Sequence, residues 1–174
     1  MTSTLTYGPA GATRPEDPDW NDQLPGFRRF EGTIVIGRGA EFWDTASQQV
    51  LRWGIKRRSG FRVQPCDGAS DYVAAGAQYV ISAAFGPVTV REPVLVVQVV
   101  DLPHRRGFAY GTQPGHPVSG EEAFIVHTTP DGTVYLTLRS LTRPAPSGPW
   151  RTAFPALLVA QQLYRRRYLR ALAA

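Results

Sequence analysis

The sequence predicts an α+β fold in which one antiparallel sheet is covered by a long C-terminal helix. Two observations indicate it: short apolar segments separated by turns fill residues 61–142, and an amphipathic segment over residues 151–172 follows a proline-rich linker. Hairpin-spaced strands favour antiparallel pairing, and a single sheet needs an element that covers one face. The length of 174 residues is that of one domain, so we expect a single domain over residues 1–174.

The N-terminal part of the chain precedes this sheet. Residues 1–26 are rich in Pro, Gly, Asp and Thr without periodicity, which indicates an irregular arm. Alternation of apolar residues then predicts a strand over residues 27–37. From Ala40 to Ile55 apolar residues recur every three or four positions, the spacing of one buried helical stripe. We therefore expect one strand and one helix before the main sheet.

The remaining strands follow from apolar runs bounded by turn residues. They are expected at residues 61–63, 72–74, 79–85, 87–100, 107–110, 121–128 and 133–142. Pro130-Asp131-Gly132 predicts a hairpin turn between the last two. Pro93 should divide its segment or lie at a sheet edge, because proline cannot donate to a ladder. In the final helix, Pro155 fits the first turn.

This order of elements resembles the helix-grip arrangement of the pollen-allergen and lipid-transfer-like superfamily. In that fold a curved antiparallel sheet, here of about six to seven strands, wraps a long C-terminal helix. The resemblance implies a cavity for an apolar ligand between the sheet and the helix.

A closer resemblance is carried by short motifs that follow one another along the chain. They are Leu5-Thr-Tyr7, Gly11-Ala-Thr13, Gly37-Arg-Gly39, Leu51-Arg-Trp53, Gly107-Phe-Ala-Tyr-Gly-Thr112, Pro114-Gly-His-Pro117, Ser119-Gly-Glu-Glu-Ala-Phe124 and Arg167-Tyr-Leu-Arg170. Together they resemble uncharacterised protein family 0548, a bacterial and plant family of unknown function. The match spans nearly the whole chain and is most specific in its middle block. It implies a fold and a location for a site, and it implies no reaction.

The middle block also holds the candidate catalytic residues Tyr110, His116 and Glu122. Successive side chains of a strand face opposite sides, so Glu121 and Glu122 should point apart. Glu122 shares its face with apolar neighbours, and burial would raise the pKa of its carboxyl toward the range of a general base. The alternative is that one glutamate fixes the glycine-rich loop through backbone N–H groups while the other is solvated.

Further side chains are candidates either for the core or for the lining of a pocket. Arg139 is expected in mid-strand on the face of Tyr135, where it would hold an anionic ligand, pair with a glutamate or lie exposed. The candidate ligand-binding residues are Tyr7, Trp43, Phe108, Glu121, Phe124, Tyr135, Arg139 and Tyr164.

Several classes of protein are not favoured. Cys66 is the only cysteine, and His104, His116 and His127 lack metal-ligand spacing. Gly37-Arg38-Gly39 lacks a phosphate-loop pattern. We therefore expect no metal and no cofactor.

No apolar run approaches the roughly 20 residues that span a bilayer, and the first residues lack a secretory signal, so we expect a cytoplasmic protein without a membrane span.

The formal charge of +5 raises the question of a nucleic-acid partner. However, Lys56 is the only lysine, and the skew toward arginine is typical of a G+C-rich coding bias. Two basic clusters remain, Lys56-Arg57-Arg58 and Arg165-Arg166-Arg167, the second of which suits the end of a helix. The composition is thus weak evidence for nucleic acid, and we do not expect such a partner.

Three hypotheses of function follow. The first is binding of a small apolar or aromatic molecule between the sheet and the C-terminal helix. The second is a cofactor-independent enzyme of the cyclase, dehydratase or hydrolase type that uses Glu and His acid–base chemistry in the same cavity. The third is nucleic-acid binding through the arginine clusters. The sequence gives neither the ligand nor the oligomeric state.

Overall fold

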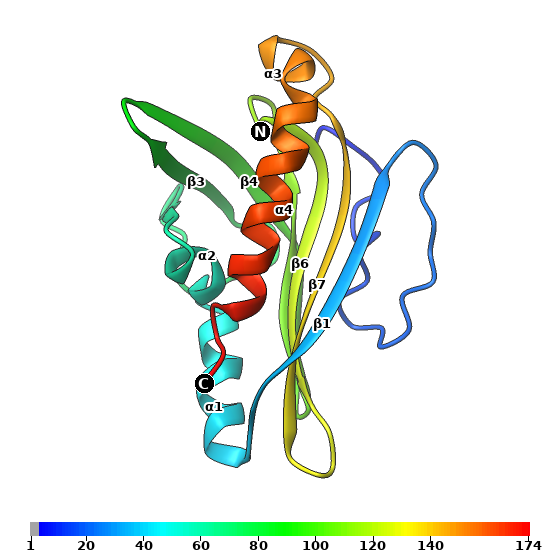
Figure 1. Cartoon of the computed structure of the whole chain (residues 1–174), viewed down its shortest axis with the longest axis vertical. Helices are drawn as coiled ribbons and strands as arrows, with labels where there is room; N and C mark the ends of the chain where they lie inside the picture. The colour runs from blue at the N-terminus through cyan, green and yellow to red at the C-terminus, as the bar shows by residue number, and fades with distance from the viewer. Residues whose placement is uncertain (1–3) are drawn as a thin grey trace.

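The computed structural model describes residues 4–174, which form one curved antiparallel sheet with helices on one face (Figure 1). Its elements are β1 (Arg28–Arg38), α1 (Ala40–Val50), α2 (Gly54–Arg58), β2 (Arg62–Pro65), β3 (Gln78–Phe85), β4 (Val88–Leu102), β5 (Arg105–Thr112), β6 (Val118–Thr128), β7 (Thr133–Pro144), α3 (Pro149–Thr152) and α4 (Phe154–Arg170). The strand order is β1-β7-β6-β5-β4-β3-β2. The α+β helix-grip fold, with seven strands, is confirmed.

The main core lies between the helices and one side of the sheet, which we call the inner face. Phe108 of β5, Phe124 of β6 and Leu138 of β7 are register partners on this face, and all are buried. Burying each such side chain stabilises the fold by about 1.5–3 kcal/mol. The helix α4 crosses this face (Figure 1). The register of three neighbouring strands thus creates one continuous apolar layer beneath the helix.

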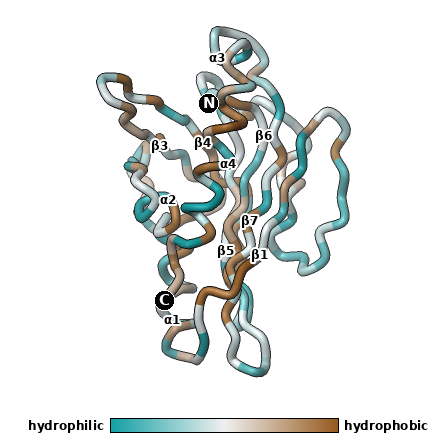
Figure 2. The backbone as a smooth tube through the Cα atoms, in the orientation of Figure 1, coloured by the Kyte–Doolittle hydropathy of each residue, from teal (hydrophilic) through white to brown (hydrophobic). Residues whose placement is uncertain are grey.

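The N-terminal arm covers the opposite side of the sheet, the outer face. Thr6 N–H of the arm donates to the Thr112 carbonyl at the end of β5, and the Trp20 indole donates to the Ala12 carbonyl within the arm. Its looped part is mainly hydrophilic in Figure 2 and lies on the far side of β1 and β7 from α4. The arm is irregular, as predicted, and residues 1–3 of it lie outside the described residues.

The single helix predicted over residues 40–55 is wrong, because the chain breaks into α1 and α2 at Trp53. Trp53 has a left-handed backbone with φ of 61°. Its buried indole packs against Tyr79, Phe108 and Tyr110, with ring centroids 4.9, 4.6 and 5.4 Å apart. The packing of the Trp53 side chain therefore ends the first helix before residue 55. After this break, α2 runs toward the inner face.

Two strand predictions also need correction. Residues 72–74 form a loop, in which Val73 N–H bonds to the Leu51 carbonyl instead of a strand neighbour. Pro93 does not divide β4, which runs unbroken between β3 and β5. Pairing of β4 with β5 starts only at Val94, and the Pro93 carbonyl accepts from Gln113 N–H just past the end of β5. The missing N–H of Pro93 therefore faces a point where no ladder partner is needed.

The C-terminal helical segment is split as well. The short α3 precedes α4, and Ala153 lies between them. Pro155 lies in the first turn of α4, as predicted. Only Tyr168 among the residues of α4 is fully buried. Side chains therefore do not completely fill the space between this helix and the sheet. This incomplete contact is where the candidate site lies.

Candidate functional site

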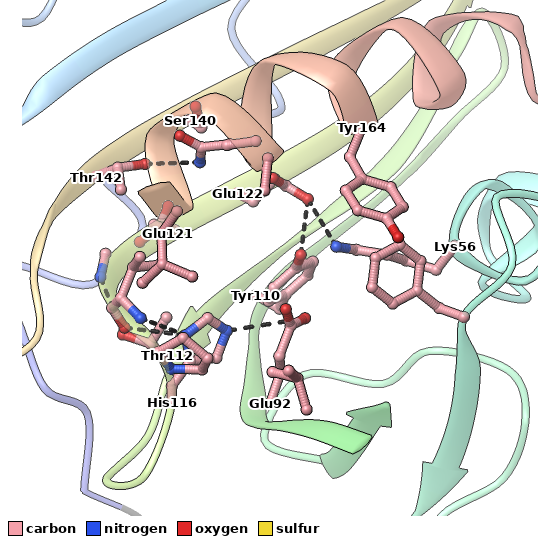
Figure 3. Close-up of a pocket in the computed structure, with 18 of the residues that line it drawn as sticks. Lys56, Glu92, Tyr110, Thr112, His116, Glu121, Glu122, Ser140, Thr142 and Tyr164 are labelled. Carbon is pink, nitrogen blue, oxygen red and sulfur yellow. Dashed lines mark hydrogen bonds and ion pairs between the residues drawn. The ribbon is translucent and has the colours of Figure 1, made fainter. Parts of the chain in front are cut away.

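A cavity of about 130 Å³ opens between α4 and the inner face near one end of β5 and β6 (Figure 3). Apolar cavities of about 150 Å³ accept a molecule the size of benzene. The polar or ionisable residues that border the cavity are Lys56, Glu92, Tyr110, Thr112, His116, Glu121, Glu122, Ser140, Thr142, Gln161, Tyr164 and Tyr168. Its apolar wall includes Phe61, Phe85, Val90, Leu141 and Leu157. The cavity thus combines apolar walls with a concentrated set of polar groups.

Glu122 is the centre of a buried polar network. Tyr110 and Glu122 are cross-strand partners, and the Tyr110 hydroxyl donates to Glu122 Oε1 at 2.7 Å. The Lys56 ammonium lies 3.3 Å from the same oxygen (Figure 3). Burial, followed by the negative charge of Glu122, raises the pKa of Tyr110 well above its usual value, so its phenol keeps its proton. The network therefore presents a neutral phenol beside an ion pair.

Lys56 occupies an aromatic cage. Its Nζ lies 4.5 Å from the ring centre of Tyr168, 4.8 Å from Phe61 and 5.4 Å from Tyr110. It also donates to the Tyr168 hydroxyl at 2.8 Å. Burial alone would lower the pKa of Lys56, but Glu122 and the other polar neighbours outweigh it and raise the pKa well above the usual value. The ammonium is therefore charged and unsuited to act as a nucleophile.

His116 and Glu92 form a second polar group in the cavity. His116 Nδ1 lies 3.1 Å from Val118 N and 2.9 Å from the Val118 carbonyl oxygen, which fixes the ring. Its Nε2 lies 4.0 Å from Glu92 Oε2 (Figure 3). Burial, and then the charge of Lys56, lowers the pKa of His116 to about 3, so the ring is neutral at pH 7. Burial also raises the pKa of the Glu92 carboxyl.

The two neighbouring glutamates face opposite sides of β6, as the alternation predicted. Glu122 points to the inner face, whereas the Glu121 carboxylate lies on the outer face beneath the arm. There it accepts hydrogen bonds from the Tyr7 hydroxyl, Gly11 N–H, and the N–H and hydroxyl of Thr13. Glu121 borders the cavity only at the strand, since both its carboxylate oxygens bond the arm. The structure thus gives Tyr7 and Glu121 an anchoring contact in place of the expected ligand contact.

Arg139 and Tyr135 also lie on the outer face, against the expectation that they contact a ligand in the cavity. Arg139 Nε is 2.6 Å from Glu31 Oε2, and its other nitrogens donate to carbonyls of the arm, among them Arg14 at 2.6 Å. Tyr135 stacks on His127 with ring centroids 5.0 Å apart. Because β7 alternates, odd-numbered residues from 135 to 139 face away from α4. Pairing of Arg139 with a glutamate, one of the alternatives from the sequence, is what the structure shows.

The remaining aromatic candidates divide between core and cavity. Trp43, Phe108 and Phe124 belong to the hydrophobic core, and none of them borders the cavity. Tyr164 of α4 does border it, in contact with Phe61 at a ring-centroid distance of 4.8 Å. Tyr110, His116, Glu122 and Tyr164 are therefore the candidates that the fold brings together at one place.

Lys56, Glu92 and Tyr168 border the cavity but are not among the site residues predicted from the sequence. The sequence groups Lys56 with the basic residues Arg57 and Arg58, whereas in the structure it is buried and bonded to groups on β6 and α4. One signal was present: a single lysine in a chain that otherwise uses arginine is an unusual choice of side chain. Glu92 gave no signal, because its proximity to His116 depends on the register of β4 with β5.

The two arginine clusters meet at the surface, away from the cavity. Arg58 of α2 and Arg166, Arg167 and Arg170 of α4 border one shallow hollow. None of the four has an acidic partner within salt-bridge distance in residues 4–174. Arg58 donates to the Ala171 carbonyl just after α4, which is the contact that a cation makes at a helix C-terminus.

Residues 4–174 contain neither a cluster of metal-binding side chains nor a helix that could span a membrane. No three His, Cys, Asp or Glu side chains in this range gather closely enough to hold a metal ion. No helix within it has the length and apolar character needed to cross a bilayer.

The curved sheet, the long α4 and the cavity between them define a helix-grip fold. Comparison of structures agrees. A hypothetical protein of Helicobacter pylori superposes with a TM-score of 0.62 at 11% identity, covering 99% of this chain and 96% of that one. Ara h 8.0201 superposes with a TM-score of 0.50 at 11% identity, covering 84% of this chain and 99% of that one. At these identities the likeness shows the fold alone.

Comparison of sequences gives the family. The model of a domain of unknown function, DUF1990, matches residues 6–171. The UPF0548 protein of Deinococcus radiodurans is 33% identical over 164 residues, which cover 89% of this chain and 78% of the relative. The chain belongs to this uncharacterised family, and the resemblance seen in its motifs is confirmed.

Proposed function

We propose that the protein binds a small apolar or aromatic molecule in the cavity between the sheet and α4. The observation that carries this proposal is the combination, in one cavity of about 130 Å³, of apolar walls with the buried Lys56, Glu122 and Tyr110 network. Ligand sites typically join apolar surface with a few placed polar groups that fix orientation. A cytoplasmic location, expected from the sequence, is part of this proposal.

Native mass spectrometry of protein purified without denaturation tests it, followed by extraction and identification of the bound molecule. We expect a stoichiometric small molecule on the wild-type protein. Ala160→Phe should abolish its retention, because Ala160 borders the cavity and a phenyl ring would fill it. Ala156→Phe is the matched control, since Ala156 is exposed one turn earlier in α4. Equal occupancy of wild type and Ala160→Phe would contradict binding at this place.

A second candidate is a cofactor-independent enzyme of the cyclase, dehydratase or hydrolase type in the same cavity. The observation that favours it is the pair of carboxyl groups with different surroundings. Glu122 is paired with Lys56, whereas Glu92 has a raised pKa and faces a neutral imidazole. Two carboxyl groups in different surroundings are the usual basis of acid and base roles in one site. Glu92 is then the proton donor, and Tyr110 with Lys56 would stabilise negative charge on an oxygen.

Recovery of the ligand after incubation separates the two candidates. The extracted molecule is added back to protein freed of ligand and analysed by mass spectrometry after several hours. Recovery of the unchanged molecule supports binding alone. Formation of a product that wild type makes and Glu92→Gln does not make supports the enzyme.

A further inference from the structure

The strongest unassigned feature of the cavity is the gap between His116 and Glu92. His116 is 8% exposed, and its Nε2 has no hydrogen-bond partner among residues 4–174. The nearest acidic atom is Glu92 Oε2 at 4.0 Å, beyond the 2.7–3.2 Å or so of a direct hydrogen bond. The ring nitrogen borders the cavity and faces the carboxyl without bonding to it, which leaves room for one intervening group that bonds to both.

The distance defines the size of that group. An oxygen about 2.8 Å from both atoms would see them at an angle of about 90°, about 20° below the tetrahedral value of a hydroxyl. A single oxygen atom therefore fits the gap, whereas a larger group would have to push the two side chains apart. The ring is held by Val118, so it cannot close the gap by itself.

The hydrogen-bonding pattern defines the chemistry. When Val118 N–H donates to Nδ1, the proton of the neutral ring lies on Nε2 and faces a carboxylate acceptor. When Nδ1 donates to the Val118 carbonyl, Nε2 is an acceptor and the Glu92 carboxyl, whose pKa is raised, supplies the donor. Either arrangement offers one donor and one acceptor at the gap. A hydroxyl both accepts and donates through one oxygen, which an ammonium or a carboxylate cannot do.

We propose that the His116–Glu92 pair is a hydroxyl-recognition subsite, so that the ligand of this cavity is a hydroxylated apolar molecule, a phenol or an alcohol. This inference rests on the proposed binding function. The apolar body of the ligand contacts Phe85, Val90 and Leu157, which border the same cavity, while its hydroxyl bridges the pair. In the free protein the bridging position suits a water molecule, which the ligand hydroxyl displaces with its hydrogen bonds preserved.

Two probes of nearly equal shape test the proposal: phenol and toluene, which differ by a hydroxyl in place of a methyl group. Dissociation constants of both are measured by NMR titration of the full chain. The quantity of interest is the ratio of the toluene constant to the phenol constant. We expect Glu92→Leu and His116→Asn each to lower this ratio by about tenfold, the effect of losing one hydrogen bond of about 1.4 kcal/mol. In His116→Asn the amide still bonds to the Val118 backbone.

Matched controls are Glu41→Leu and His104→Asn, which make equivalent changes at exposed positions. Both should keep the wild-type ratio. Toluene binding reports that each variant is folded with an intact cavity. A ratio that stays at the wild-type value in both Glu92→Leu and His116→Asn, with toluene still bound, overturns the hydroxyl subsite and leaves cavity binding standing. If wild type binds neither probe, the binding function itself is contradicted, and the subsite with it.

Discussion

Glu121 and Glu122 are neighbours in sequence but lie on opposite faces of β6 in different surroundings. Glu121, on the outer face, accepts four hydrogen bonds, all from the N-terminal arm. Glu122, on the inner face, has the Tyr110 hydroxyl and the Lys56 ammonium as partners and borders a cavity. A carboxylate that the protein satisfies fully holds structure together, whereas one with remaining acceptor capacity beside empty volume is available to a ligand.

The two faces also differ in their buried cation, which is Arg139 on the outer face and Lys56 on the inner face. Arg139 on the outer face is buried and divides its donors between Glu31 and carbonyls of the arm. Lys56 on the inner face makes one ion pair and one hydrogen bond within its aromatic cage. The planar guanidinium suits several fixed carbonyls at once, and the compact ammonium suits a cage. The outer face is thus built as an attachment surface and the inner face as a recognition site.

The largest effect expected is on the outer face. Glu121→Ala would leave the Tyr7 hydroxyl, Gly11 N–H and both donors of Thr13 without an acceptor. Each buried unsatisfied group costs about 1–3 kcal/mol, part of which is recovered when the arm detaches into water. We therefore expect a loss of about 4 kcal/mol in the free energy of unfolding, measured by urea denaturation, and faster proteolysis within the arm.

The exposed Glu41→Ala is the control for this substitution, with an expected loss of about 0.5 kcal/mol for a charge at a helix N-terminus. A cost for Glu121→Ala as small as that of the control would show that the arm contributes little, and the contrast between the two faces would lose its basis.

A smaller effect is expected for the ion pair of the inner face. Lys56→Met removes the cation and leaves Glu122 buried beside two phenols, at a cost of about 3 kcal/mol in the free energy of unfolding. Adding Glu122→Leu to this variant should restore most of that stability, because it removes the uncompensated charge. Thermal unfolding of the two single variants and the double variant measures the coupling. Additive losses would mean that the pair does not act as a unit.

The sequence was sufficient to predict that the two glutamates lie on opposite faces of the sheet. Strand alternation alone separated Glu121 from Glu122, and the motifs around Tyr110 and His116 located the end of the sheet where the cavity opens. These are local features, and two-residue periodicity is enough to place side chains on the two faces of a strand. The seven strands and the long last helix followed from the same kind of signal.

What the sequence could not supply depends on contacts between distant segments. Lys56 reaches Glu122 only because the helix breaks at Trp53, and that break depends on rings contributed by β3 and β5. Glu92 faces His116 only because of the pairing of β4 with β5, and Arg139 turned out to hold an arm more than 100 residues away. Tertiary packing decides such positions, and local propensity carries little information about them.

The effect that is smallest per pH unit is a dependence of stability on pH that the inner face should show through His116. Its pKa is lowered to about 3 in the folded protein, against 6.5 for an unperturbed histidine. Between these values the unfolded chain binds more protons, so the free energy of unfolding falls as pH drops, by up to about 1.4 kcal/mol per pH unit. His127, with a pKa of about 4, acts in the same direction, and the raised pKa of Glu92 acts in the opposite one.

Urea denaturation of wild type and His116→Asn at intervals from pH 7 to pH 4 isolates the contribution of His116. The variant should show a shallower slope than wild type, while His104→Asn should keep the wild-type slope. Identical slopes in wild type and His116→Asn would mean that the ring gains its proton without cost, which is incompatible with a neutral imidazole locked in a buried cavity.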